Sequence, residues 1–132
     1  MMNTQLTVII PVFNEINSIE QLLIKVLNNK IDKQIIVVDD HSSDGTRELL
    51  INKFKNKVDK IIFHKKNLGK GAAIKSAQKY IIGKYTIIQD ADLEYDPSDY
   101  LSLINEAEKN EFQVVYGSRV LNKNMHTNIK NF

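Results

Sequence analysis

Five short runs of apolar, mostly β-branched residues recur along the chain, and they constrain its fold more than any other feature. Each run is nearly continuous rather than alternating between apolar and polar residues, which is typical of strands buried on both faces. We therefore predict a sheet that is covered by helices on both sides. The predicted strands are Leu6–Val12, Gln34–Asp39, Lys60–His64, Tyr85–Gln89 and Gln113–Gly117.

The segments between these runs have the patterns of helices. Apolar residues recur at helical spacing over Ile19–Leu27, and Ser18 with Gln21 predicts a capping box at the start. Asp96 followed by Pro97 predicts the start of another helix, because aspartate favours the N-cap and proline the first helical position. Two more helices are expected after glycine-containing turns, one on each side of the third run.

Strands and helices alternate along the chain, and each interval is long enough for a right-handed crossover between parallel strands. The sequence therefore predicts an α/β protein with three α/β/α layers and a mostly parallel sheet. With 132 residues and 42% hydrophobic content, the chain can build one core. We expect one domain over residues 1–120, followed by a polar tail over residues 121–132.

Charge and cysteine content exclude several classes of function. The formal net charge is only +2, with acidic and basic residues interspersed, so nucleic acid is not an expected partner. The chain has no cysteine, which rules out disulfides and thiolate metal sites and fits a cytoplasmic location. The first apolar stretch is too short for a signal peptide or a membrane span, so we expect a soluble chain that can still dock at a membrane surface.

Acidic residues follow three of the predicted strands. They are Glu15 after the first, Asp39 and Asp40 at the end of the second, and Asp90, Asp92 and Glu94 after the fourth. Because the carboxyl ends of parallel strands meet at the edge where such folds bind ligands, these carboxylates are expected to converge. Crowded carboxylates repel one another unless a cation compensates. The pattern therefore predicts a divalent metal.

The segment Asp90-Ala91-Asp92 is the candidate metal site, with Glu94 as a further ligand. Side chains two residues apart point to the same side of an extended segment, so both aspartates can reach one ion. Oxygen ligands suit Mg²⁺ or Mn²⁺, and Mg²⁺ takes its other ligands from water and phosphate. An acidic triplet alone also occurs in solvated turns, so the prediction depends on its position opposite two other acidic strand ends.

Two familiar phosphate-binding motifs are absent. The chain has neither G-x-G-x-x-G after its first strand nor G-x-x-x-x-G-K-[ST], which argues against dinucleotide dehydrogenases and P-loop enzymes. Gly69-Lys70-Gly71 either places Lys70 at a helix N-terminus, where anions are favoured, or forms a plain turn. His41 is expected in a turn, and His64 and His126 are assigned no chemistry.

Five segments in order resemble family 2 glycosyltransferases of the GT-A fold, the nucleotide-diphospho-sugar transferase type. Within that family the chain is most similar to the polyprenyl-phosphate (dolichyl-phosphate) mannose and glucose synthases. The resemblance runs from about Leu6 to Arg119. The segments are Val8–Glu15, Ile36–Thr46, Asn67–Gly71, Gln89–Pro97 and Val115–Arg119.

The resemblance implies a role for particular residues. Those that would contact the nucleoside are Pro11, Phe13, Glu15, Val38 and Asp40, with Asp40 at the base or ribose and Asp39 in support. Those that would contact the diphosphate and its metal are Asp90, Ala91, Asp92 and Glu94, with Arg119 near the donor phosphates; Lys70 is a further candidate for nucleotide-sugar binding. The residues implied to take part in catalysis are Asp92 and Arg119; an arginine fork suits phosphate oxygens.

The implied reaction moves a hexose from a UDP- or GDP-linked donor to an acceptor, with inversion at the anomeric carbon and Mg²⁺ or Mn²⁺ as cofactor. A polyprenyl phosphate is the expected acceptor, which implies docking at the cytoplasmic face of a membrane. Enzymes of this group continue well past the strand that corresponds to Gly117-Ser118-Arg119. The residues after that strand normally supply their acceptor pocket. The 132-residue chain alone is therefore expected to bind the donor with little turnover.

Two other classes share part of the pattern. A receiver-type phosphoacceptor signalling domain is the alternative, because it has a similar length and an acidic, Mg²⁺-binding edge. It carries its paired acids after the first strand and its phosphoacceptor after the third, however, whereas here the acids follow strands one, two and four. A sugar nucleotidyltransferase would have a glycine-rich, basic loop after the first strand, where this chain has Phe13-Asn14-Glu15.

Overall fold

The computed structural model describes residues 4–92, 96–110, 114–116 and 119–121, the last two ranges as backbone. Among these residues, no helix is long and apolar enough to span a lipid bilayer. The elements in chain order are β1 (Leu6–Val12), α1 (Ile19–Asn28), β2 (Lys33–Asp39), α2 (Thr46–Leu49) continuing into the π-helical turn η1 (Leu50–Phe54), β3 (Lys60–Phe63), α3 (Lys70–Gln78), β4 (Tyr85–Ile88), the 3₁₀ turn η2 (Pro97–Asp99), α4 (Tyr100–Asn110), β5 (Val114–Tyr116) and β6 (Arg119–Leu121).

The strands form one sheet in the order β3-β2-β1-β4-β5-β6, parallel except for the antiparallel β5–β6 pair. The chain leaves β1 toward β2 on one side and returns to β4 on the other, so the order reverses between β1 and β4. Ligands of open α/β sheets bind at such a reversal, outside the carboxyl ends of the strands. A receiver domain has the order 2-1-3-4-5, so the topology does not fit that alternative.

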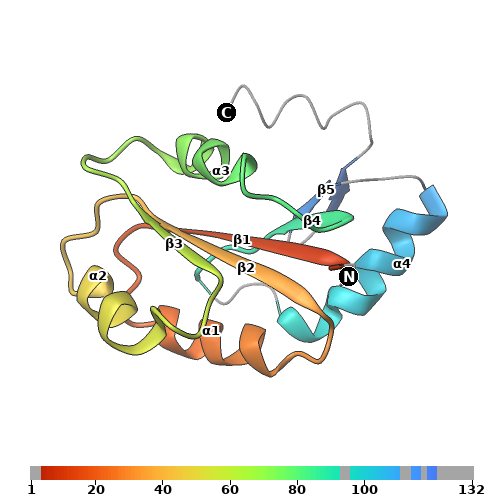
Figure 1. Ribbon diagram of the computed structural model, residues 1–132, viewed down its shortest axis with the longest axis horizontal. Coiled ribbons are helices and arrows are strands. Elements are labelled where there is room, and N and C mark those ends of the chain that lie inside the picture. The colour runs from red at the N-terminus through yellow and green to blue at the C-terminus, as the bar shows by residue number, and fades with distance from the viewer. Residues whose placement is uncertain (1–3, 93–95, 111–113, 117–118, 122–132) are drawn as a thin grey trace.

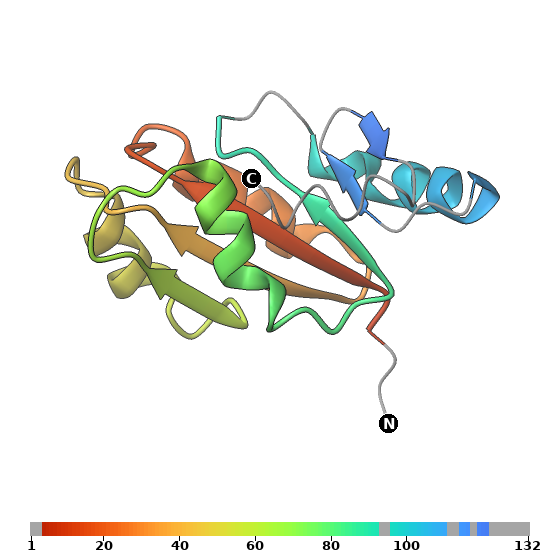
Figure 2. The same ribbon diagram turned by 90° about the horizontal axis from the view of Figure 1, so that it is seen from above.

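Helices cover both faces of this sheet, which confirms the three-layer prediction (Figure 1). Helix α3 lies on one face, and Figure 2 shows it crossing over β1 and β2. Helices α1 and α4 and the α2–η1 segment lie on the other face. Strand β1 serves both cores, since Ile9 packs toward α3 while Val8 and Ile10 pack toward α1. Both faces of the strand are buried, which explains its continuous apolar sequence.

Several predicted details were wrong. Ser18 makes no side-chain cap bond at the start of α1, so the predicted capping box is absent. The third and fourth strands end one residue early, at Phe63 and Ile88, and the second begins one residue early, at Lys33. The second helix is short and widens into a π-helical turn. At the fourth helix the prediction is confirmed, since the Asp96 carboxylate accepts the Ser98 N–H at 3.0 Å.

The C-terminal region contains one strand more than expected. The last strand, β6, was not predicted, and it pairs antiparallel with β5 at the edge of the sheet. Most of the predicted polar tail lies outside the described residues.

Candidate functional site

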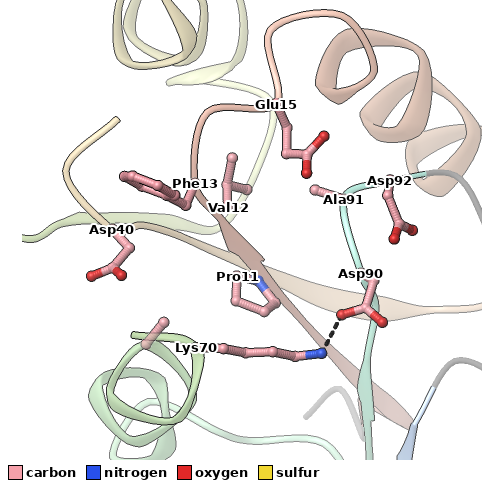
Figure 3. Close-up of a pocket in the computed structure, with 10 residues that line it drawn as sticks. Pro11, Val12, Phe13, Glu15, Asp40, Lys70, Asp90, Ala91 and Asp92 are labelled. Carbon is pink, nitrogen blue, oxygen red and sulfur yellow. Dashed lines mark hydrogen bonds and ion pairs between the residues drawn. The ribbon is translucent and has the colours of Figure 1, made fainter. Parts of the chain in front are cut away.

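A cavity of about 190 Å³ opens at the carboxyl ends of β1 and β4, where the strand order reverses. Its wall comes from the ends of β1, β2 and β4 and from the first turn of α3 (Figure 3). The lining residues are Pro11, Val12, Phe13, Glu15, Asp40, Lys70, Ala73, Asp90, Ala91 and Asp92.

Eight of the residues selected from the sequence lie together in this lining, namely Pro11, Phe13, Glu15, Asp40, Lys70, Asp90, Ala91 and Asp92. Val38 is instead fully buried in the core beneath α3. The backbone of Arg119 lies in β6 opposite Tyr116, and its side chain is not described. Glu94 lies outside the described residues. The convergence of acidic strand ends is thus seen for Glu15, Asp40, Asp90 and Asp92.

The Asp40 carboxylate holds the loop that leads into α3. Its Oδ1 accepts the Leu68 N–H at 2.8 Å, and its Oδ2 accepts the Gly69 N–H at 2.7 Å. The His64 ring nitrogen Nδ1 lies 2.8 Å from the same Oδ1. We call this set of bonds the Asp40 clamp. Burial would raise the pKa of Asp40, but hydrogen bonds from His64, Leu68 and Gly69 outweigh it and hold the pKa below its ordinary value.

His64 was the residue that sequence reasoning missed. It is buried, with Nδ1 on Asp40 and Nε2 2.8 Å from the Ser76 hydroxyl of α3. The chain Asp40–His64–Ser76 therefore links the ends of β2 and β3 to α3. The available signal was position, because His64 directly follows β3 at the same edge of the sheet as the acidic residues.

The loops after β1 and β2 are joined by side-chain hydrogen bonds. The Asn14 N–H donates to the Ser42 hydroxyl at 2.9 Å, and the Ser43 N–H donates to Asn14 Oδ1 at 2.8 Å. The Glu15 N–H donates to the Thr46 hydroxyl at 3.2 Å. These bonds hold Glu15 at the cavity and explain why short hydroxyl and amide side chains occupy both turns.

Two residues in these loops have left-handed backbone conformations, Asn14 with φ of 52° and His41 with φ of 67°. Non-glycine residues adopt this region uncommonly and mostly in functional loops and turns. The left-handed conformation of His41 is typical of turn residues.

The neighbouring aspartate, Asp39, faces away from the cavity. It is fully buried, and its Oδ2 accepts the Ser42 N–H at 3.1 Å and lies 3.8 Å from Arg47 Nε. Its Oδ1 is buried without a hydrogen-bond partner among the described residues. Asp39 thus braces the turn that carries Asp40.

The segment Asp90-Ala91-Asp92 follows β4 on the far side of the cavity. The Ser18 hydroxyl donates to the Ala91 carbonyl oxygen at 2.6 Å, which ties this segment to the start of α1. The Lys70 ammonium forms an ion pair with Asp90 Oδ1 across the cavity mouth (Figure 3). The hydroxyl expected to cap α1 therefore positions the candidate metal segment instead.

The residues at this segment fit a divalent cation that is bound together with a phosphorylated ligand. Within the described part of the chain, no cluster of three or more acidic or histidine side chains is arranged to hold an ion alone. Asp90 and Asp92 supply two carboxylates, and Mg²⁺ characteristically uses one or two and completes its shell with water and phosphate oxygens. Metal and phosphate would therefore depend on each other.

Comparison with known proteins gives one family. The model of glycosyl transferase family 2 matches residues 7–131. A dolichyl-phosphate β-glucosyltransferase of Dictyostelium discoideum is 34% identical, over 89% of this chain and 40% of its own length. A dolichol-phosphate mannosyltransferase of Pyrococcus furiosus is 33% identical, over 87% of this chain and 33% of its own length. The chain thus spans well under half of these relatives.

The fold is similar to that of a solved glycosyltransferase. The solved structure of the mannosyltransferase PcManGT from Pyrobaculum calidifontis, in complex with GDP-Man and Mn²⁺, superposes with a TM-score of 0.66. It is 25% identical and covers 76% of this chain and 31% of its own. The sequence motifs, the sheet order and the family match over nearly the whole chain agree: this chain belongs to glycosyl transferase family 2.

Proposed function

We propose that this chain forms the donor-binding part of a glycosyltransferase that moves a hexose from a UDP- or GDP-linked sugar to a polyprenyl phosphate. The observation that carries the proposal is the single cavity in which Glu15, Asp40, Lys70, Asp90 and Asp92 meet. Support comes from the relatives, whose names specify dolichyl-phosphate sugar transfer, and from the solved neighbour with GDP-Man and Mn²⁺.

We propose that different parts of the cavity would bind different parts of the donor. The nucleoside would lie between Pro11, Phe13 and Asp40; the Phe13 side chain is 47% exposed at the rim, where its ring can stack on a base. The diphosphate would lie toward Ala91 and Asp92, with the Lys70 ammonium in reach as a cationic partner. Arg119 would add a second cation from β6.

Asp90 and Asp92 would hold the divalent cation, Mg²⁺ or Mn²⁺, with Glu94 as a further candidate. When bound, the cation neutralises negative charge on the leaving diphosphate. In the transfer, the bond between the anomeric carbon and the diphosphate oxygen breaks, and a phosphate oxygen of the acceptor bonds to the opposite face of the carbon, inverting it. That oxygen is already ionised, so the acceptor needs no strong general base.

The setting of the reaction is part of the proposal. A lipid phosphate acceptor would bring the protein to a membrane surface on the cytoplasmic side. Because the chain spans only 40% and 33% of its two relatives, we propose that the isolated 132 residues bind the donor with little turnover.

Binding measurements test the proposal directly. UDP and GDP are titrated into the chain by calorimetry, with and without Mn²⁺, and at least one is expected to bind more tightly with the metal. Asp92→Asn should reduce the metal-dependent part of the affinity by at least about tenfold. Asp32→Asn is the matched control, since it removes an exposed carboxylate that precedes β2 at the opposite edge of the sheet. Equal nucleotide affinities with and without Mn²⁺ would refute the proposal.

A further inference from the structure

The Lys70–Asp90 ion pair joins two elements that otherwise stand on opposite sides of the cavity. Lys70 is the first residue of α3, and Asp90 follows β4. Figure 3 shows the lysine side chain running past Pro11, at the end of β1, to the aspartate. The ammonium thus sits on a carboxylate that the proposed function assigns to the divalent cation.

The backbone that carries this lysine is fixed in place. The Asp40 clamp binds the N–H groups of Leu68 and Gly69 immediately before it. After it, Ala73 and Ile74 are fully buried against the sheet. Rotation of its own side chain is therefore the simplest way for the ammonium to leave Asp90.

The ion pair itself is open to exchange. The Lys70 and Asp90 side chains are 47% and 43% exposed, so water or an incoming ligand reaches both. The ammonium and the aspartate line the same cavity as Asp92 and Ala91, so a short rotation keeps the lysine within the proposed diphosphate site.

We propose that Lys70 is an internal counter-cation of Asp90 and makes the binding of divalent cation and nucleoside diphosphate cooperative. The inference rests on the proposed function. The ammonium repels a cation on the same carboxylate, so a cation that binds Asp90 would displace it, and a diphosphate that recruits the ammonium would also separate it from Asp90. Breaking the Lys70–Asp90 ion pair once frees a group for each ligand. The first ligand to bind therefore supplies the free energy of breaking the ion pair, and the second binds without that loss.

The shared ion pair contributes to the cooperativity in addition to the direct attraction between metal and phosphate. By thermodynamic linkage, each ligand raises the affinity of the other by the same factor. An ion pair as exposed as this one is worth at most about a fivefold change in an equilibrium constant. Lys70 should therefore weaken Mn²⁺ binding without nucleotide by up to about fivefold and increase the mutual enhancement by the same factor.

The experiment compares Lys70→Met with two matched variants. Lys75→Met removes an exposed lysine of the same helix, and Lys70→Arg keeps the charge. Mn²⁺ binding without nucleotide is followed by electron paramagnetic resonance. UDP and GDP binding with and without Mn²⁺ is followed by calorimetry, which gives the enhancement factor.

We expect Lys70→Met to bind Mn²⁺ alone more tightly than the wild type, by up to about fivefold, and to lose the same factor of the enhancement. Lys75→Met should match the wild type in both, and Lys70→Arg should keep the weaker binding of Mn²⁺ alone because it retains the positive charge. If Lys70→Met also matches the wild type in both, while the wild type shows Mn²⁺-dependent nucleotide binding, this inference alone fails. If the wild type shows no such dependence, the proposed function fails as well.

Discussion

Replacing Asp40 by asparagine tests whether the Asp40 clamp stabilises the fold as strongly as its geometry indicates. The wild-type carboxylate accepts three hydrogen bonds and is 3% exposed. An asparagine has one oxygen, so its amide NH₂ must face at least one of the three donors. Hydrogen bonds to a charged group contribute about 1.5–3 kcal/mol each, and the loss of one should lower the free energy of unfolding by about 2–3 kcal/mol.

Urea denaturation followed by circular dichroism measures this difference, and its pH dependence adds a second check. The pKa of Asp40 is lowered in the folded protein, so its stabilisation is fully present above the pKa of the unfolded carboxyl, about 3.9. It is lost as the pH falls through the lower folded pKa. The difference between wild type and Asp40→Asn should therefore be present at pH 5 and shrink toward pH 3.

Asp32→Asn is again the control, because a substitution at an exposed site should change the stability by less than about 0.5 kcal/mol. An Asp40→Asn protein that unfolds within about 0.5 kcal/mol of the wild type at pH 5 would refute the reasoning. So would a difference that persists undiminished at pH 3.

Three further predictions concern the Asp40 clamp and two other close contacts. His64→Leu removes one donor of the clamp and should lower the free energy of unfolding by about 1–3 kcal/mol in urea, with His64→Gln closer to the wild type. Ser18→Ala removes the bond to Ala91 and should cost about 1 kcal/mol in the same assay and weaken Mn²⁺-dependent nucleotide binding; unchanged binding would show that the bond is dispensable. Gly83→Ala places a Cβ 2.5 Å from the Thr7 backbone nitrogen and should destabilise by more than about 2 kcal/mol, measured as a lower melting temperature.

Much of the site was predictable because strand ends in a parallel sheet share one edge. Glu15 lies far from Asp90 and Asp92 in the sequence, yet both positions follow buried apolar runs, and those runs could be read directly. The first strand was predicted with its observed bounds, Leu6–Val12. Ser18 was misread because its hydroxyl bonds to two partners that a capping box does not include: the Glu15 carboxylate, and the Ala91 carbonyl oxygen, which only the fold brings near.

The sequence by itself determined the layers and the edge of the sheet where the acidic residues gather, since both follow from local periodicity and from the direction of parallel strands. Local periodicity did not determine which of two adjacent aspartates would serve the cavity; the family resemblance assigned Asp40, which the structure places in the lining. Successive residues at a strand end point to opposite sides, so Asp39 and Asp40 cannot both face it. Only the packing of α3 on one face and of α2 on the other decided that Asp40 lines the cavity and Asp39 lies buried.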